Sequence, residues 1–339
     1  MCLRPFALIG PSAGGKRIME LIRGLHNLRR QHRGCVATIG NFDGVHLGHQ
    51  YVLSQLQQKA RSHGLPSLVI SFEPTPREYF APEAAPVRLT ALRDKLEALQ
   101  QSEVERVLCL RFDARLANMP AADFIREVLV EKLGVRHLVV GDDFRFGRKR
   151  QGDFAMLEQA GDEFGFAVER MGTREIDGER ISSTRIREAL AQGQLDLAAR
   201  LLGRPYTLSG RVVRGKQLGR ELGYPTANIP LARWRSAVAG IYAVRVACGD
   251  EVHAGVASVG TRPTVNDDDT VLLEVHLFDF DGDLYARRLW VRFEHWLRPE
   301  EKFDDLDALI VQMQRDEAAA RAWFATGPAP TIKLDRTGK

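Results

Sequence analysis

The sequence predicts two domains of different fold class: an α/β domain with a parallel sheet, then an antiparallel β-barrel with a terminal helix. Three observations predict this. The chain has 339 residues, and at about 150 residues per domain two domains are expected. Short apolar runs alternate with amphipathic stretches from residue 33 to about 200, as in a parallel sheet covered on both faces. Beyond residue 204, strand-like segments follow one another with short turns, as in a barrel or sandwich.

Composition and charge narrow the kinds of partner. Hydrophobic residues make up 44% of the chain and charged residues 27%, as in an ordinary soluble globular protein. The 48 basic and 44 acidic residues leave a formal net charge of +4, which suits small anions such as phosphates better than nucleic acid. No apolar run approaches the roughly 20 residues that span a bilayer. We expect small-molecule substrates, and neither nucleic acid nor a membrane, as partners.

The cysteine pattern indicates a reducing compartment. No two of the four cysteines are close enough for a Cys-x-x-Cys pair, so neither a zinc site nor a thioredoxin-like site is expected. A disulfide framework would need more cysteines in a smaller chain. The expected location is therefore the cytoplasm. The cysteines are Cys2, Cys35, Cys109 and Cys248.

The first 18 residues resemble a phosphate-binding loop only in part. Gly10, Gly15 and Lys16 have the spacing, but Arg17 stands where such a loop needs Ser or Thr. We expect a disordered tail or an over-long start here, with Met19 as the alternative first residue. The predicted domains are 19–203 and 204–326, and 327–339 is a second tail.

The first domain is predicted from its alternating elements. Ligands of such sheets bind beyond the carboxyl ends of the strands, so motifs that follow strands matter most. The expected strands are Cys35–Gly40, Ser67–Phe72, Arg106–Arg111, His137–Gly141 and Phe166–Met171. Helical spacing connects Leu89, Leu92, Leu96 and Leu99, and also Phe124, Ile125, Val128, Leu129 and Leu133.

The most informative motif follows the first of these strands. His46 and His49 are three residues apart, so they share one face at the start of a helix, where free N–H groups and the helix dipole attract anions. Two imidazoles there can stabilise charge on a triphosphate. The alternative is an Asx-turn at Asp43 with two solvated histidines. The motif reads Gly40-Asn41-Phe42-Asp43-Gly44-Val45-His46-Leu47-Gly48-His49.

A second motif, Ile181-Ser182-Ser183-Thr184-Arg185-Ile186-Arg187, ends the same region. It predicts a helix that begins after a serine N-cap. With a histidine pair available, the hydroxyls of Ser183 and Thr184 and the guanidinium of Arg187 make a plausible phosphate clamp. Taken alone, the motif is equally well explained as a cap.

These motifs together resemble the HxGH nucleotidyltransferase superfamily, and more narrowly the adenylyltransferase half of bacterial FAD synthetases. The resemblance implies a Rossmann-like domain in which the residues from Gly40 to Gly44, His46, His49, Ser183, Thr184 and Arg187 bind ATP, with the histidines and Arg187 catalytic. Two further matching segments, 72–78 and 141–147, imply a flavin site with Phe72, Pro74, Asp142, Phe144 and Phe146. The family often has histidine where Thr75 stands, so no role is assigned to that position.

The aromatic residues of segment 141–147 have two interpretations of their own. Phe144 and Phe146 follow a strand, so their rings could stack on a flat ligand. The alternative is that they are buried and anchor the loop.

The second domain is predicted from consecutive strands and a terminal helix. Cys248-Gly249-Asp250 is typical of a hairpin connection. The expected strands are Tyr206–Val213, Gly240–Ala247, Glu251–Ser258, Val271–Phe280 and Arg288–Trp296. The expected helix contains Phe303, Leu306, Leu309, Ile310 and Met313.

A glycine-rich segment in this domain predicts a phosphate site. Amides around Gly215 and Gly219 can hold phosphates with Lys216 and Arg220 nearby. Thr226 and Asn228 offer neutral oxygens, and Mg²⁺ takes a few such ligands together with water and phosphate groups. The alternative is a glycine-rich barrel loop with an Asx-type turn.

Glu274 stands out in a strand with alternating side chains. Alternation places Leu272, Glu274, His276 and Phe278 on one face and Leu273, Val275 and Leu277 on the other. A carboxylate between apolar neighbours is costly without a partner or a purpose, and accepting a proton from an alcohol is such a purpose. The alternative is a carboxylate in water on an exposed face.

This half is similar to the riboflavin kinase family. The resemblance implies that Thr226 and Asn228 bind Mg²⁺ and ATP, that Glu274 is the catalytic base and contacts the flavin with Arg262, and that the glycine-rich segment binds ATP. Ala286 stands where the family commonly has glycine. If that position needs a positive φ, alanine strains the turn, and we expect a local effect rather than lost activity.

The tandem implies two reactions on one chain. Riboflavin and ATP would give FMN and ADP in the barrel, and FMN and ATP would give FAD and diphosphate in the α/β domain, with Mg²⁺ required and both flavins as products. One alternative is another HxGH nucleotidyltransferase, such as a cytidylyltransferase, fused to a binding barrel. The other is a nucleic-acid-binding barrel, which the weak positive charge argues against.

Overall fold

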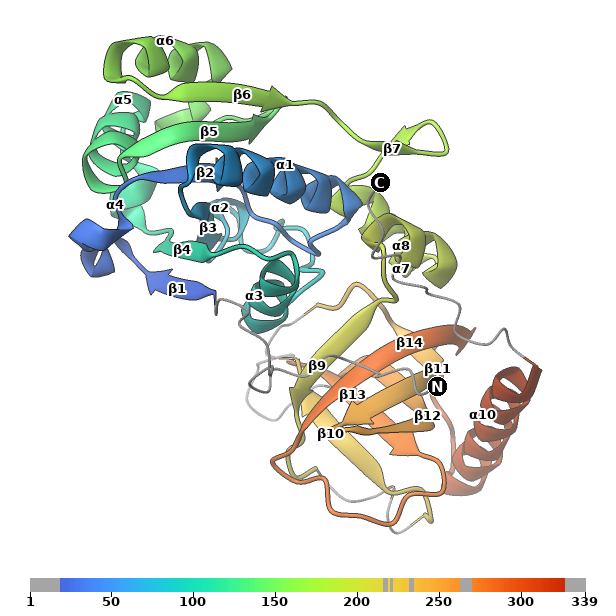
Figure 1. The fold of residues 1–339 in the computed structure, drawn as a ribbon. Coiled ribbons are helices and arrows are strands. Elements are labelled where there is room, and N and C mark those ends of the chain that lie inside the picture. The colour runs from blue at the N-terminus through green and yellow to red at the C-terminus, as the bar shows by residue number, and fades with distance from the viewer. Residues whose placement is uncertain (1–18, 216–218, 220–221, 232–234, 263–269, 327–339) are drawn as a thin grey trace. The chain divides into compact units, whose positions relative to one another are not determined.

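The computed structural model describes residues 19–215, 219, 222–231, 235–262 and 270–326, with backbone alone for residues 261, 262 and 270. The two expected tails, Lys216 and Arg220 lie outside this part. The chain divides into two compact units, one that ends at Ser183 and one that begins at Thr184 (Figure 1).

The first unit is built on a six-stranded, fully parallel sheet in the order β1-β4-β3-β2-β5-β6. The predicted parallel sheet is confirmed. Strand β2 lies between β3 and β5, and the strands on its two sides are reached by connections that run in opposite directions across the sheet. The topological switch point of the sheet therefore lies at the carboxyl end of β2. The strands are β1 (Glu20–Arg23), β2 (Cys35–Ile39), β3 (Ser67–Glu73), β4 (Arg106–Arg111), β5 (Val135–Gly141) and β6 (Ala167–Met171).

Helices cover both faces of this sheet. Helices α1 (Leu47–His63) and α3 (Leu92–Gln101) pack on one face, against alternate strand residues such as Val36 and Val69. The π-helical segment η3 (Phe124–Lys132) and helix α6 (Phe154–Phe164) cover the other face. The shorter helical elements are α2 (Pro76–Phe80), α4 (Ala114–Ala117), α5 (Ala121–Asp123), η1 (Leu25–Asn27), η2 (Arg30–His32) and η4 (Arg148–Arg150).

Two features of this unit differ from the sequence prediction. Strand β1 at the sheet edge and the hairpin of β7 (Glu175–Ile176) and β8 (Glu179–Arg180) were not predicted, because strands of four and two residues are too short to show a period. Leu89 lies before helix α3 instead of within it, since its N–H and that of Thr90 bond to the Asp43 carboxylate.

The second unit begins within helix α7 (Ser183–Ala191), at Thr184, and continues with helix α8 (Leu195–Leu202) and an antiparallel six-stranded sheet. The strand order is β10-β13-β12-β11-β14-β9, and a bridge between Val213 and Asn228 brings the two edges together. Gly210 of β9 packs against Ile229 of β10, where a Cβ would collide. The sheet is therefore a nearly closed barrel, as predicted. Its strands are β9 (Thr207–Arg211), β10 (Thr226–Pro230), β11 (Gly240–Cys248), β12 (Glu251–Arg262), β13 (Thr270–Leu277) and β14 (Arg288–Arg298).

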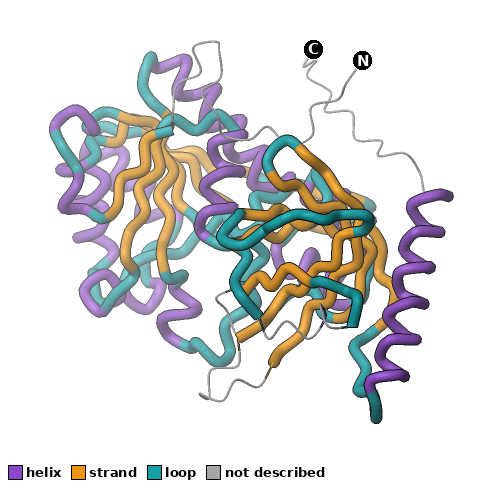
Figure 2. Tube along the Cα trace, turned by 90° about the horizontal axis from the view of Figure 1, so that it is seen from below, coloured by secondary structure: helices purple, strands orange, loops and turns teal. Residues whose placement is uncertain are grey.

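The terminal helix α10 (Leu306–Thr326) packs on the outer side of β11, β12 and β14, as Figure 2 shows. Its Ala320 and Trp323 contact Ala243 and Val256. Phe303 precedes this helix, although the sequence pattern included it. Within the described residues, no helix is both long and apolar enough to cross a membrane.

Candidate active sites

The loop after β2 lies at the switch point of the parallel sheet. It adopts left-handed backbone at Phe42 (φ 50°), Gly44 (φ 83°) and Val45 (φ 41°). Two of these residues carry side chains, and such conformations cost on the order of 1–3 kcal/mol each. Phe42 and Val45 are 3% and 1% exposed, so burial of their side chains helps to hold the loop. The loop is thus a strained, well-anchored connection in the place where such sheets bind ligands.

The two histidines meet at the first turn of α1. His46 is the N-cap, and its Nδ1 accepts from the N–H of His49 at 3.2 Å. A neutral ring that accepts at Nδ1 holds its proton on Nε2. The rings stack with centroids 3.6 Å apart and planes 16° apart. A Cβ on Gly48 would lie 3.2 Å from the His46 ring, so glycine leaves room for this packing. The expected shared face is confirmed.

Asp43 holds the loop to a distant segment of the chain. Its carboxylate accepts from the N–H groups of Leu89 and Thr90 and from the Thr90 hydroxyl, at 3.0–3.2 Å. The Thr90 Oγ1 in turn accepts from the N–H of Gly44 at 3.1 Å. These bonds give the Asp43 carboxylate a structural role across more than forty residues of sequence. Gly40 is half-buried and Asn41 is exposed beside it.

The second motif starts beside the same loop. Ser183 donates its hydroxyl to the Asp43 carbonyl at 3.0 Å, and a Cβ on Gly48 would lie 3.4 Å from the Ile181 carbonyl. Ile181 and Ser183, more than 130 residues away in sequence, therefore lie beside this loop. Thr184 and Arg187 follow on α7, where Thr184 is exposed and Arg187 is half-buried.

An aromatic group lies at the carboxyl ends of β3 and β4. Phe72 is half-buried and packs edge-on against Phe112, with ring centroids 5.8 Å apart. Tyr79 and Phe80 of α2 also contact Phe112 edge-on, and Phe80 is 65% exposed. Sequence reasoning singled out Phe72 and Pro74 but missed the other three aromatics. For Tyr79 and Phe80, their closeness to Phe72 in sequence was the available signal, whereas Phe112 follows β4 and gave none.

The loop after β5 places its aromatic and acidic residues differently. Phe146 is 9% exposed and joins the core of the sheet, which supports the anchoring interpretation for this residue. Phe144 is half-buried and stacks on Phe146 with centroids 5.5 Å apart. Asp142 is exposed, accepts from the Thr173 hydroxyl at 2.8 Å and pairs with Arg180 at 3.5 Å.

In the barrel, Glu274 of β13 is paired in register with Asn228 of β10. Directly opposed residues of antiparallel strands lie on the same face. The inward residues Leu273 and Val275 are buried, whereas Glu274 and His276 are half-exposed, which confirms the predicted alternation up to Leu277. Phe278 lies past the strand end and is 6% exposed, because it packs under α10 with Ala320. The Glu274 carboxylate and the Asn228 amide are therefore neighbours.

Gly215 and Gly219 lie close to the polar side chains of β10. A Cβ on Gly215 would meet the Asn228 amide at 2.6–2.7 Å, and one on Gly219 would lie 3.4 Å from the Thr226 Oγ1. Segment 226–230, which was not among the expected strands, is strand β10. It forms a strand because it pairs with β13, and its sequence has no local period that predicts a strand.

His276 links the start of β10 to the strand of Glu274. Its Nδ1 donates to the Pro225 carbonyl at 3.0 Å, since a carbonyl oxygen can only accept. Its ring packs edge-on against Tyr224, with centroids 5.1 Å apart. The segment before Thr226 is thus held against the strand that contains Glu274.

The donor set of Thr226 and Asn228 fits Mg²⁺. The Nδ2 of Asn228 donates to the Thr226 carbonyl at 3.2 Å, which turns the amide oxygen of Asn228 away from that carbonyl. Neutral oxygens with nucleotide phosphates and water are ligands that Mg²⁺ accepts. The described residues hold no group of three or more His, Cys, Asp or Glu side chains arranged for a metal. Lys216 and Arg220 lie outside the described residues, and Arg262 is described only as backbone of β12.

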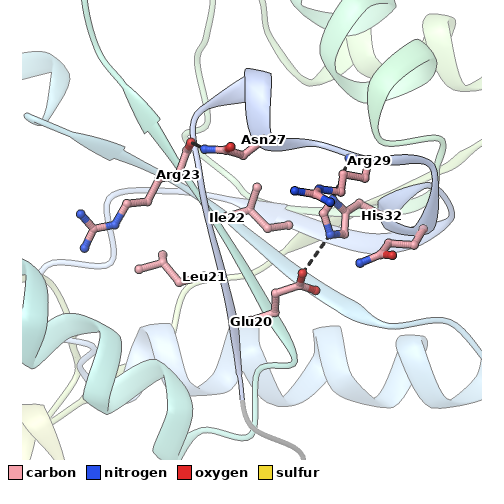
Figure 3. Close-up of a pocket in the computed structure, with 8 residues that line it drawn as sticks. Glu20, Leu21, Ile22, Arg23, Asn27, Arg29 and His32 are labelled. Carbon is pink, nitrogen blue, oxygen red and sulfur yellow. Dashed lines mark hydrogen bonds and ion pairs between the residues drawn. The ribbon is translucent and has the colours of Figure 1, made fainter.

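A separate pocket of about 380 Å³ lies at edge strand β1. Figure 3 shows Glu20 pointing to His32, while Arg23 and Arg29 lie on opposite sides of the strand. The Nε2 of His32 is 2.9 Å from the Glu20 carboxylate. None of the residues that line this pocket belongs to the predicted sites.

Both departures from the family pattern have local explanations. Thr75 is the N-cap of α2 and forms a capping box with Glu78, a task that suits threonine. Ala286 has φ 60°, so the expected positive φ is confirmed. Its N–H bonds to the Val212 carbonyl at 3.0 Å, which helps to hold the strained residue in place.

Comparison with known proteins agrees with the division of the chain into an α/β part and a barrel part. The FAD synthetase family model matches residues 28–185, and the riboflavin kinase family model matches residues 202–324. The bifunctional riboflavin kinase/FMN adenylyltransferase of Pseudomonas fluorescens is 54% identical over 307 residues, which cover 91% of this chain and 98% of that one. The protein of the same description from Escherichia coli strain K12 is 51% identical over 314 residues, 92% of this chain and 100% of that one.

A solved structure has the same fold over most of its length. It is described as a macrolide-efflux protein from Streptococcus pneumoniae, and it aligns over 90% of this chain and 99% of its own with a TM-score of 0.75 and 29% identity. Because each half of the chain matches one family model and both curated relatives are more than half identical over nearly their whole length, the chain belongs to the family of bifunctional riboflavin kinases/FMN adenylyltransferases and makes FMN and FAD.

Proposed function

We propose that the barrel phosphorylates riboflavin at Glu274 and that the α/β unit adenylates FMN at the loop 40–49. The observation that carries the first assignment is the register of Glu274 opposite Asn228. The second rests on the stacked pair of His46 and His49 at the first turn of α1. Glu274 and Asn228 lie within one compact unit, and His46 and His49 lie within the other, which supports a separate reaction for each pair.

In the kinase reaction the ribityl 5′-hydroxyl of riboflavin attacks the γ-phosphorus of ATP. Glu274 accepts the hydroxyl proton as general base. Backbone amides around Gly215 and Gly219, with Lys216 and Arg220, bind the phosphates, and Arg262 contacts the flavin beside Glu274. Thr226 and Asn228 orient the nucleotide from β10. Mg²⁺ bound with the phosphates would neutralise the charge that develops on them.

In the adenylyltransfer reaction the phosphate of FMN attacks the α-phosphorus of a second ATP, and diphosphate leaves. The loop from Gly40 to Gly44 and the amides at the start of α1 receive the phosphates. His46 and His49 stabilise the reacting phosphates, and Ser183, Thr184 and Arg187 bind the leaving diphosphate. No covalent intermediate is needed, because positioning and charge stabilisation suffice for this chemistry.

The flavin ring of FMN is proposed to lie near the carboxyl ends of β3 and β5. Phe72, Pro74 and the exposed ring of Phe80 offer aromatic and apolar surface on one side. Phe144 and Asp142 offer an aromatic ring and a polar group on the other, with Phe146 buried beneath them as support. Flat ligands stack well on such surfaces.

The proposed setting is the bacterial cytoplasm. Cys35, Cys109 and Cys248 are free and buried, as suits a reducing compartment. Riboflavin, FMN and ATP are the proposed substrates, and FMN and FAD leave as products.

Chromatographic analysis of products tests this assignment. Riboflavin, ATP and Mg²⁺ are expected to give FMN and then FAD, and FMN with ATP is expected to give FAD alone. Omission of Mg²⁺ with added chelator is expected to stop phosphorylation. A chain that used CTP in preference to ATP would favour the cytidylyltransferase alternative. FAD formation from FMN with no FMN formation from riboflavin would contradict the assignment of the barrel.

A further inference from the structure

Lys95 is a buried lysine that the proposed reactions do not use. It lies on helix α3 and is 3% exposed. Its Nζ donates to the Asn41 carbonyl at 3.1 Å and lies 3.5 Å from the Ser71 Oγ. Lysine is almost never this buried without a paired charge, so its position calls for a physical reason.

The partners of this ammonium group are unusual for a buried cation. Among the ion pairs of the described residues none includes Lys95, and its bonded partners are a backbone carbonyl and a hydroxyl. Burial lowers the pKa of Lys95, although the charges of Glu73 and Asp43 act to raise it. Burying a charge without a direct counter-ion costs free energy. The charged group in question lies at the start of the loop after β2.

The loop that Lys95 holds has left-handed backbone at Phe42 and Val45. Such a loop keeps its shape only if its surroundings determine it fully. The Asn41 carbonyl, immediately before the first strained residue, is held by Lys95. Asp43 and Gly44, between the two strained residues, are held by Leu89 and Thr90. Both supports come from the segment 89–95.

The same segment is tied to the second proposed substrate region. Arg88, adjacent to Leu89, bonds to Glu73 at 2.6 and 3.1 Å and to Glu78 at 2.6 Å. Glu73 ends β3 and Glu78 belongs to α2, the elements that contain Phe72 and Phe80. The segment 88–95 therefore supports both the loop that contains the histidines and the aromatic group.

We propose that Lys95 is a positioning residue for adenylyl transfer, whose ammonium group fixes the Asn41 carbonyl and so holds the loop 40–45 in the shape that receives ATP. This rests on the proposed binding of ATP at that loop. Lys95 touches neither substrate, and it acts through the backbone of Asn41.

The test compares Lys95→Met with wild-type enzyme as full-length chains. Methionine keeps much of the length and volume and removes the donor. We expect kcat/KM of FAD formation from FMN to fall about 100-fold, the effect of a misplacement near 1 Å. We expect kcat to fall and KM for ATP to rise, with KM for FMN unchanged. Hydrogen exchange at the amides of residues 41–45 is expected to quicken. Riboflavin phosphorylation on the same chain is expected to stay unchanged.

A matched control separates positioning from stability. Leu129→Val removes one methylene from the core on the other face of the sheet, at a fully buried residue whose hydrophobic cluster contains neither Phe42 nor Val45. It is expected to lower thermal stability and leave both activities unchanged. If Lys95→Met does not fold, Lys95→Leu, which also removes the donor, is judged by the same criteria.

The outcomes distinguish this inference from the proposal beneath it. FAD formation and loop exchange within twofold of wild type in the folded Lys95 variant would overturn the role of Lys95, provided that His49→Ala is inactive. FAD formation that survives His49→Ala would instead overturn the loop as the ATP site. Equal loss of both activities in a folded Lys95→Met would also overturn the inference, because a loop effect is confined to adenylyl transfer.

Discussion

Glu274 on β13 lies directly opposite Asn228 on β10, on the face of the barrel that points away from the buried Leu273 and Val275. The amide of Asn228 is in turn covered by the backbone of Gly215. A carboxylate, an amide oxygen and a glycine-rich backbone thus meet at one point. This arrangement suits the proposed phosphoryl transfer, in which Glu274 acts as general base.

Glu274→Gln is expected to lower FMN formation by about 10²–10⁴-fold, because the side chain keeps its shape and loses its basicity. FAD formation from supplied FMN is expected to be unchanged. The measurement is product chromatography from riboflavin and from FMN. Glu251→Gln, an exposed substitution at the start of β12, is the control and should change neither reaction. Loss of both reactions in folded Glu274→Gln would contradict the division of labour.

His49→Ala is expected to have the reverse effect, with FAD formation from FMN reduced about 10²–10³-fold, as for removal of a donor to developing charge. Riboflavin phosphorylation is expected to persist. His63→Ala, at the exposed end of the same helix, controls for loss of any imidazole from α1. A His49 variant that makes FAD at the wild-type rate would exclude this histidine from the reaction.

Gly215→Ala is expected to weaken the kinase reaction, because the added Cβ would lie 2.6–2.7 Å from the Asn228 amide. Overpacking of this kind costs about 1–3 kcal/mol, and we expect a raised KM for ATP in FMN formation. Gly172→Ala is the matched control, since a Cβ there meets nothing within 4 Å. Unchanged kinase kinetics in Gly215→Ala would show that the Gly215 backbone does not lie against Asn228 in the working enzyme.

Ala286→Gly is expected to raise the free energy of unfolding by about 1 kcal/mol, because alanine at φ 60° is strained and glycine is not. Both activities should be retained. Ala247→Gly, in ordinary strand backbone of β11, is expected to have the opposite sign. Denaturant titration of the two variants measures both effects, and a less stable Ala286→Gly would argue against strain at this turn.

Acid is expected to weaken the connection between β3 and α2. Burial opposes ionisation of Glu78, but hydrogen bonds from Arg88 and Thr75 outweigh it, so the pKa of Glu78 lies below its ordinary value of 4.5. A carboxyl with a depressed folded pKa adds stability above its unfolded pKa and loses it as the pH falls through the folded pKa. The contribution should therefore be complete near pH 7 and disappear below about pH 4.5.

Glu78→Gln is expected to lower the thermal midpoint at pH 7 and to flatten its decline in acid. Circular dichroism melts at several pH values measure this. Glu83→Gln removes an exposed carboxylate from the following turn and should leave the curve unchanged. If the thermal midpoints of wild type and Glu78→Gln declined equally in acid, this would contradict the depressed pKa of Glu78.

The sequence by itself determined the class of each unit, the positions of the motifs and the faces of regular elements. The alternation around Glu274, the shared face of His46 and His49 and the turn at Ala286 follow from local period and local sterics. Short apolar runs also located the five longer strands of the parallel sheet, of which β2, β3, β4 and β5 are mostly buried while the edge strand β6 is not.

Only the tertiary structure decided which groups meet. Strand β10 exists because β13 pairs with it, and the same register places Asn228 beside Glu274. Asp43, assigned from sequence to ATP, is bonded to Leu89 and Thr90, and Lys95 reaches the Asn41 carbonyl from more than fifty residues away. These contacts depend on strand pairing and helix packing between segments far apart in the chain, and no periodicity along the sequence encodes them.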